Sequence, residues 1–272
     1  MFLKLYKYIF SRSIFSKVNN WILTFTLAAR GYDNYRNKNE SGEKFFINKV
    51  LSPTNPILCL DIGANIGLYT IELLRNTNSK VICFEPLPKA FQILSETTRD
   101  MQHRVTLEKK GVGKKIENLY LHFNPSENDT GQQASFSEDV KKVSYVSNEA
   151  KILAPIVTLD SYCEEKNITD IDLIKIDTEG FESEIFEGAT NTFSKIRPKF
   201  IHIEFNWHHL FRNISLKTFA EKLPDYQVYQ LIPNGWVKRD PRDPLTNIYY
   251  YSNFLFVRKS KTYSTFRNYV YQ

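Results

Sequence analysis

Short apolar runs alternate with amphipathic stretches along most of the chain after residue 56. Runs such as LCLDI and DLIKI are almost continuously apolar, which is typical of strands buried on both faces of a parallel sheet. The pattern predicts strands at 57–62, 80–84, 104–108, 172–176, 200–205, 227–231 and 254–258. Helices are predicted near 43–51 and at 68–75, 88–100, 159–166, 182–190 and 216–223. This alternation predicts an α/β protein with a mostly parallel sheet and helices on both faces.

The first 30 residues differ from the rest of the chain. They contain no acidic residue, and the first one in the sequence is Asp33. Two interpretations are open: an amphipathic helix packed on the domain, or a peripheral helix on an anionic membrane. No stretch reaches the ~18 apolar residues that crossing a bilayer needs, and basic residues interrupt the apolar stretch that a signal peptide requires. The residues behind these interpretations are basic (Lys4, Lys7, Arg12, Lys17, Arg30) or apolar at helical spacing (Phe10, Ile14, Val18, Trp21, Phe25).

Composition limits the remaining possibilities. The 272 residues are 42% hydrophobic and fit one domain with a short appendage, which we divide into a helical extension (1–42), a main domain (43–260) and a tail (261–272). Three scattered cysteines form no disulfide framework and favour a reducing compartment, hence the cytoplasm, or a peripheral place at the inner face of the membrane. A net charge of +6 without a basic stripe predicts no nucleic-acid partner. The oligomeric state stays open.

The first predicted strand ends in the motif DIGANIG, residues 61–67. We expect Gly63 to permit a tight turn and Gly67 to let the helix approach the strand closely. Asn65 stands where the dinucleotide fingerprint has its middle glycine. A pyrophosphate requires bare N–H groups and no carboxylate beside it, whereas S-adenosylmethionine carries an ammonium and a sulfonium, which suit Asp61. The motif therefore favours S-adenosylmethionine as the cofactor.

Acidic residues also end the later strands. Glu85 follows the second strand and is placed to accept both ribose hydroxyls of a nucleoside. Asp177 and Glu204 end two further strands at the same predicted edge, and His202 lies two residues before Glu204. We rank Asp177 first, Glu204 second and His202 third as a general base, with a core role open for His202. Glu179 and Glu182 are interpreted as helix-start residues, and no metal site is predicted.

Five segments taken together resemble the FkbM family of S-adenosylmethionine-dependent methyltransferases: DIGANIGLYT, VICFEPLPKAF, VTLDSY, DLIKIDTEGFESEIFEGA and HIEFN. The resemblance spans about residues 43–258. It implies a class I methyltransferase fold, which is a Rossmann-like seven-stranded sheet, and O-methylation of hydroxyls on surface glycans or natural products. The resemblance thus implies a hydroxyl compound as the acceptor, and we expect a carbohydrate.

The resemblance also assigns cofactor contacts. The methionine part would lie on the loop after the first strand, the ribose on Glu85, and the adenine near Pro86 and the turn at 111–113. Ser135 matches a family serine near the site. The full expected set is Asp61, Gly63, Ala64, Asn65, Gly67, Tyr69, Thr70, Glu85, Pro86, Leu87, Gly111, Val112 and Ser135.

Two irregular segments should select the acceptor, 123–143 and 233–247. The first is either a surface loop or a lid over the site. Trp236 and the tyrosines at 249–251 either stack on a sugar ring or pack on the last strands. Two alternatives to a methyltransferase are kept: a dinucleotide-dependent oxidoreductase, and a non-catalytic, membrane-associated nucleoside-binding protein.

Overall fold

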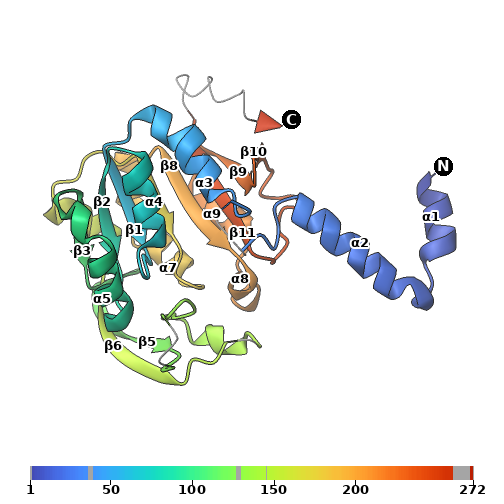
Figure 1. Ribbon diagram of the computed structural model, residues 1–272, viewed down its shortest axis with the longest axis horizontal. Helices are drawn as coiled ribbons and strands as arrows, with labels where there is room; N and C mark the ends of the chain where they lie inside the picture. The colour runs from blue at the N-terminus through green and yellow to red at the C-terminus, as the bar shows by residue number, and fades with distance from the viewer. Residues whose placement is uncertain (1, 36–38, 127–129, 145, 260–269, 272) are drawn as a thin grey trace.

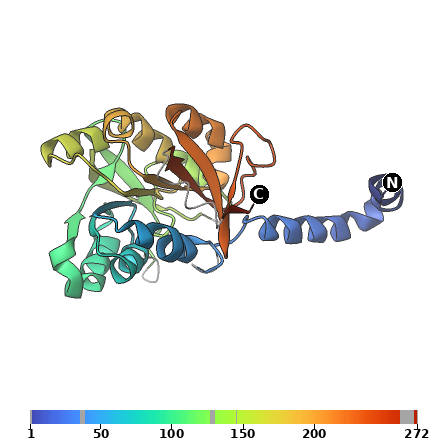
Figure 2. The same cartoon turned by 90° about the horizontal axis from the view of Figure 1, so that it is seen from above.

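One large sheet forms the middle layer of the body, with helices on both faces (Figures 1 and 2). The computed structural model describes residues 2–35, 39–126, 130–144, 146–259 and 270–271. In this part of the chain the sheet has nine strands in the order β12-β10-β9-β11-β8-β7-β1-β2-β3. These strands are β1 (Leu58–Ile62), β2 (Lys80–Phe84), β3 (Val105–Glu108), β7 (Leu173–Ile176), β8 (Phe200–Phe205), β9 (Tyr226–Ile232), β10 (Gly235–Lys238), β11 (Ser252–Arg258) and β12 (Val270–Tyr271).

The seven predicted strands occupy the sheet from β3 to β9. Strands β3, β2, β1, β7 and β8 run parallel to one another, and β11 is antiparallel to both β8 and β9. This confirms the predicted mostly parallel, Rossmann-like sheet. Strands β10 and β12 extend it, because β10 folds back on β9 as an antiparallel hairpin and β12 pairs with β10. The rest of the predicted tail, 261–269 and 272, lies outside the described residues.

Two hydrophobic cores fill the spaces between the sheet and its helices. Along β1, Leu60 and Ile62 enter one core and Cys59 enters the other, as expected because strand side chains alternate in direction. The first core holds α6, α7 and α9, and the second holds α4, α5 and the segment from α3 to Leu51. The three cysteines are buried thiols, which act as small apolar core residues. The helices of the body are α3 (Glu43–Phe45), α4 (Leu68–Asn76), α5 (Pro88–Thr97), α6 (Leu159–Glu165), α7 (Glu182–Glu187), α8 (Trp207–Phe211) and α9 (Leu216–Lys222).

A second, three-stranded sheet was missed by the sequence analysis. It consists of β4 (Gly111–Val112), β5 (Glu117–Phe123) and β6 (Ala150–Val157) in the order β4-β6-β5. Its strands are only partly buried, with alternating inward and outward positions, so they lack the continuous apolar runs of the main sheet. Pro155 in β6 also obscured the pattern, because proline is uncommon inside strands. The last residues of β5 connect to the segment at 123–143.

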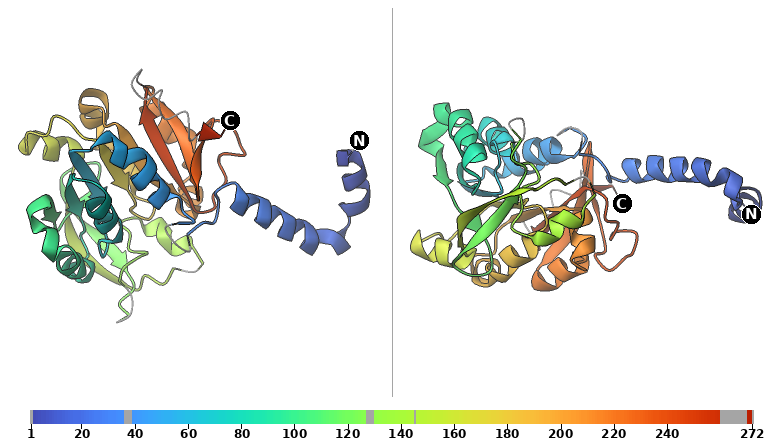
Figure 3. Two further views of the ribbon diagram at one scale, coloured as in Figure 1. Left: turned by 45° about the horizontal axis from the view of Figure 1, so that its top comes forward. Right: turned by 90° about the horizontal axis from the view of Figure 1, so that it is seen from below.

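The N-terminal residues form two helices that project from the body (Figures 1 and 3). These are α1 (Phe2–Phe10) and α2 (Ser16–Ala29), and neither contains a buried residue. Of the two open interpretations, a helix packed on the domain therefore does not hold for most of this stretch, although Leu27 near the end of α2 packs against the core. Tyr32 and Ser41 are buried in the body, so residues after the second helix pack on the domain. Among the described residues, no helix has the length and apolar content needed to cross a bilayer.

The parallel strands end level with one another. Ile62 pairs with both Phe84 and Ile176, and Ile176 pairs with Ile203. The loops that follow β1, β2, β7 and β8 therefore meet at one edge of the sheet, where ligands of open α/β sheets bind.

Candidate active site

A cavity of about 770 Å³ lies at the carboxyl edge of the sheet. The loops after β1, β2, β7 and β8 form its walls, and residues from three further segments close it: 33–43, 111–136 and 207–251. Of the residues predicted to bind a cofactor, nine line it: Asp61, Gly63, Ala64, Asn65, Tyr69, Glu85, Pro86, Gly111 and Val112. The predicted bases Asp177 and Glu204 also line it.

The loop after β1 is folded tightly against its neighbours. Gly63 has a φ of 80°, and a Cβ on it would lie 1.8 Å from the carbonyl oxygen of Asp177. Only glycine fits there, because an L side chain at this φ is strained and would collide with backbone. Asn65 is also left-handed, with φ 49°, a conformation that asparagine tolerates. The loop therefore holds the end of β1 directly against the end of β7.

Gly67 has a different role from the one predicted. Its φ is 86°, and a Cβ on it would lie 2.7 Å from Leu94 Cδ1. Leu94 belongs to α5, so the close approach is between α4 and α5 and not between helix and strand.

The backbone N–H groups of the loop at 63–67 are all used inside the protein. Gly63 and Ala64 donate to Phe84 O, and Gly67 donates to Ala64 O. Asn65 N donates to Glu85 Oε2, and Ile66 N donates to Asn65 Oδ1. A pyrophosphate requires such groups to be available. The loop therefore fits a ligand without phosphate, as the motif had indicated.

Glu85 is buried at the end of β2, and its carboxylate faces the cavity. Its two oxygens accept N–H groups of Asn65 and Leu87, both at 2.8 Å. A carboxylate can accept about four hydrogen bonds, so two positions remain for a ribose diol. Burial raises the pKa of Glu85 to about 7, although the two N–H donors oppose the shift.

This pKa predicts a pH-dependent affinity for a nucleoside ligand. Below about pH 7 the Glu85 carboxyl takes up a proton, which binding of a ribose diol has to release. Affinity for S-adenosylhomocysteine should therefore fall about tenfold for each pH unit below 7 and level off above about 8. Calorimetric titrations across this range measure it. In Glu85→Gln the affinity should be lower and nearly independent of pH, and an equally steep fall in that variant would exclude Glu85 as the titrating group.

Four residues of the predicted cofactor set lie behind the wall, outside the residues that line the cavity. Thr70 Oγ1 donates to Asp61 Oδ2 at 2.6 Å and orients that carboxylate. Ser135 Oγ donates to Glu179 O at 2.8 Å and ties the loop near residue 135 to the loop after β7. Leu87 packs against Gly131. Gly67 lies where α4 and α5 approach each other closely. The structure gives these four residues supporting positions.

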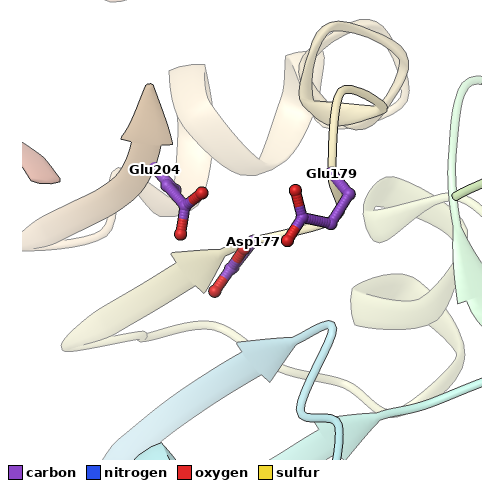
Figure 4. A group of neighbouring side chains, drawn as sticks. All are labelled: Asp177, Glu179 and Glu204. Carbon is purple, nitrogen blue, oxygen red and sulfur yellow. The ribbon is translucent and has the colours of Figure 1, made fainter. Parts of the chain in front are cut away.

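Three carboxylates meet beside the β1 loop. Asp177 directly follows β7, Glu204 is the last but one residue of β8, and Glu179 belongs to the loop before α7 (Figure 4). One oxygen from each lies within 4.8 Å of the others. The expectation that Glu179 starts a helix is wrong, because it adopts φ 54° in the preceding loop and faces the cavity. Glu182 does start α7, and its Oε1 accepts the N–H groups of Thr178 and Gly180.

Lys175 is a site residue that the sequence analysis missed. It lies in β7 next to Asp61 of β1, and its Nζ is 2.6 Å from Asp177 Oδ2. The ammonium also lies 5.0 Å from the centre of the Tyr69 ring. Burial alone would lower the pKa of Lys175, but the carboxylates of Asp177 and Asp61 raise it above its ordinary value. A lone lysine inside an apolar strand was the available signal, because buried lysines need an acidic partner.

The three carboxylates have different electrostatic surroundings. Burial, with the charges of Asp177 and Glu179, holds the pKa of Glu204 well above its usual range. Burial also raises the pKa of Glu179, although its Oε2 lies 2.9 Å from His208 Nε2. Asp177 differs from both because it forms an ion pair with the buried ammonium of Lys175. Asp177 is therefore the member of the cluster whose carboxylate lies against a fixed positive charge.

His202 does not reach the cavity. It is fully buried in β8 and is not among the lining residues. Its Nδ1 lies 3.1 Å from Tyr69 Oη and its Nε2 lies 2.8 Å from Asn253 Oδ1. Burial, together with the charge of Lys175, lowers the pKa of His202 to about 3. The histidine is therefore neutral and holds Tyr69 in place, which corresponds to the core role left open above.

The two irregular segments lie in different places. Residues 131–134 and Phe136 line the cavity, and Asn65 Nδ2 donates to Thr130 O at 3.2 Å. This part of the segment at 123–143 is thus a fixed wall of the site. In the other segment Trp236 is buried and stacks on Tyr229, which is the packing alternative. Tyr250 and Tyr251 line the cavity, with Trp207 beside Tyr250.

The strand order and this site define a class of protein, a Rossmann-like methyltransferase. The chain matches the model of the methyltransferase FkbM domain over residues 61–230, more than half of its length. The chain therefore belongs to the FkbM family of methyltransferases, which use S-adenosylmethionine, as the resemblance implied. The loop without available N–H groups and the buried Glu85 carboxylate fit this cofactor.

The two relatives named next are distant in sequence. The 2-O-methyltransferase NoeI of Sinorhizobium fredii is 26% identical over 196 residues, which are 68% of this chain and 78% of that protein. The hexuronic acid methyltransferase AglP of Haloferax volcanii is 24% identical over 144 residues, 53% of this chain and 54% of that protein. A crystal structure of precorrin-6y C5,15-methyltransferase from Geobacter metallireducens aligns with a TM-score of 0.40 and 12% identity over 79% of this chain and 85% of that one. Because the chain belongs to this family of methyltransferases, the two alternatives kept above, an oxidoreductase and a non-catalytic protein, are set aside.

Proposed function

We propose that the enzyme transfers the methyl group of S-adenosylmethionine to a hydroxyl of a carbohydrate. The observation that carries this proposal is the position of Asp177. Its backbone contacts Gly63 in the loop at 63–67, which we call the cofactor loop. Its side chain lines the same cavity as Glu85. A proton acceptor is thus fixed beside the loop that would hold the methyl donor.

The acceptor side of the cavity has the composition of a sugar site. Tyr35, Trp207 and Tyr250 line it together with the carboxylates of Asp177 and Glu204. Aromatic rings offer flat apolar surface to the C–H face of a sugar, and carboxyl groups, charged or protonated, form hydrogen bonds with its hydroxyls. Two relatives are named as a 2-O-methyltransferase and a hexuronic acid methyltransferase, which supports the same acceptor class.

The residues have separate tasks in the proposed reaction. When bound, S-adenosylmethionine supplies a methyl group on a positively charged sulfur. Asp177 would accept the proton of the acceptor hydroxyl as its oxygen bonds to the methyl carbon and the methyl–sulfur bond breaks, with S-adenosylhomocysteine as the leaving group. Lys175 holds Asp177 in position through the 2.6 Å ion pair. The walls keep water out and hold donor and acceptor in line, which accounts for much of the rate of such displacements.

A divalent metal ion, if the reaction used one, would bind to the same three carboxylates. Their spacing within 4.8 Å would suit a divalent cation, but the ammonium of Lys175 already lies on Asp177. We propose that Lys175 supplies the positive charge at this place and that transfer needs no metal, as the sequence analysis predicted.

The test is a transfer assay with a panel of neutral and uronic-acid saccharides. Mass spectrometry should find one added methyl group, and the product should resist mild alkali because a methyl ether is stable to it. The rate should be unchanged by EDTA. An alkali-labile product would mean that a carboxylate is methylated and would contradict hydroxyl transfer, and a loss of rate in EDTA would contradict the metal-free mechanism.

A further inference from the structure

The two N-terminal helices form an arm, residues 2–30, that lies outside the body for most of its length (Figures 1–3). Neither α1 nor α2 contains a buried residue. Large apolar side chains are exposed along both, including Phe2 at 86% and Trp21 at 64% of their surface. Scattered exposed apolar residues are common, but a continuous group of this size marks an interaction surface.

Part of the exposed apolar side chains of each helix form one face, while Leu3, Tyr8 and Leu23 lie outside it. In α1, Phe2, Leu5, Tyr6 and Ile9 follow helical spacing, and in α2, Val18, Trp21, Ile22 and Phe25 do the same. Lys4 and Lys7 lie on the opposite side of α1. In α1 the basic residues thus lie opposite the apolar face, which is the arrangement of helices that lie in a membrane interface.

Specific contacts hold the two helices together at the bend between them. Tyr6 Oη donates to Asn19 Oδ1 at 2.6 Å, and Asn19 Nδ2 donates to Phe10 O at 2.9 Å. The rings of Phe10 and Phe15 lie 5.0 Å apart across the bend. The arm is therefore a defined element with fixed geometry and an uncovered apolar surface.

The charge of the arm indicates what covers this surface. Residues 1–30 carry five basic side chains and no acidic one. Two such arms would repel each other, so pairing with a second copy of this chain is disfavoured. Anionic lipids attract such a segment, at roughly 1 kcal/mol for each basic residue near the surface. Long lysine and arginine side chains can also reach lipid headgroups while their stems stay in apolar surroundings.

We propose that the arm binds the surface of an anionic phospholipid membrane and holds the enzyme there. The arm is joined to the site by residues that follow α2 directly. Tyr32 is buried, with its Oη 2.9 Å from Leu245 O, and Asp33 N donates to Tyr251 O at 2.7 Å. Asp33 and Tyr35 themselves line the cavity.

The acceptor class follows from this connection and rests on the function proposed above. Because the base of the arm forms part of the cavity wall, a membrane-bound arm holds that side of the cavity near the lipid surface. The hydroxyl acceptor that suits this placement is a carbohydrate carried on a membrane lipid.

The binding test is cosedimentation of the full-length protein with vesicles of phosphatidylcholine, with and without phosphatidylglycerol. The protein should pellet with the anionic vesicles only, and each arm lysine changed to glutamine should lower partitioning roughly fivefold. The double variant Trp21→Glu/Phe25→Glu should stay in the supernatant. The control Ile116→Glu/Leu153→Glu makes the same charge change at equally exposed apolar positions of the body and should pellet like the wild type.

Some results would overturn the membrane proposal. These are wild-type protein that stays in solution with anionic vesicles, an arm variant that still pellets, or a stable dimer that the arm variant abolishes. Binding of S-adenosylhomocysteine by the same samples reports separately on the methyltransferase site. The lipid-borne acceptor is tested by comparing a glycolipid in vesicles with its free saccharide. The arm variant should lose transfer to the glycolipid and keep transfer to the free saccharide, and equal rates on the glycolipid would contradict this assignment.

Discussion

Replacing Asp177 with asparagine should lower the turnover number by about 10²- to 10⁴-fold, the usual contribution of a general base. Asparagine keeps the shape of the side chain but cannot take the proton of the acceptor hydroxyl. The affinity for S-adenosylhomocysteine should stay within a few-fold of the wild type, because the cofactor loop contacts the backbone of Asp177. Single-turnover kinetics and calorimetry on the same preparation measure the two effects.

Glu204→Gln is the matched control. The raised pKa of Glu204, caused by burial, favours its protonated form, which glutamine imitates, so turnover should change little. Should Asp177→Asn fail to fold because Lys175 is left without its carboxylate, the double variant with Lys175→Met removes both charges and should show the same loss of turnover. Full activity in Asp177→Asn, or a large loss in Glu204→Gln alone, would move the role of the base away from Asp177.

Replacing Gly63 with alanine should lower the free energy of unfolding by roughly 2 to 6 kcal/mol, the sum of backbone strain and overpacking. The new Cβ would lie 1.8 Å from Asp177 O, so the ends of β1 and β7 would have to separate. Since a domain is stabilised by about 5–15 kcal/mol in total, much of the protein should unfold in mild denaturant. Urea titration followed by circular dichroism measures this, and cofactor binding should be lost in the folded fraction.

The variant Gly67→Ala distinguishes the stability lost through backbone strain from the stability lost through a steric clash with backbone. Its φ is also positive, but its Cβ would meet the end of the flexible Leu94 side chain at 2.7 Å. The loss of stability should therefore be clearly smaller than for Gly63→Ala. Equal losses in the two variants would show that contact between the β1 loop and β7 is not what requires glycine at position 63.

The site residues at the strand ends were predictable from the sequence, because acidic residues lie at the carboxyl ends of strands that the pattern predicts to be parallel. Continuous apolar runs located β1, β2, β7 and β8, and each run ended in an acidic residue. Parallel strands bring their carboxyl ends to one edge, so Asp61, Glu85, Asp177 and Glu204 had to be neighbours. The structure places them around one cavity.

Features that depend on contacts across the fold were not predictable. The β5–β6 pair has alternating, half-exposed positions, and nothing local distinguishes such strands from a loop. Glu179 looked like a helix-start residue, yet the left-handed turn at that position directs it into the cavity. Lys175 lies two residues before Asp177, which is a local signal, but its position next to Asp61 depends on the pairing of β7 with β1.

The most direct test of the account is calorimetric titration of the purified protein with S-adenosylhomocysteine and, in parallel, with NAD. The loop at 63–67 has its N–H groups engaged, and Glu85 has room for a ribose diol. We expect one equivalent of S-adenosylhomocysteine to bind and NAD to give no heat of binding. Binding of NAD, or no binding of S-adenosylhomocysteine, would contradict the claim that this cavity is built for a donor without phosphate.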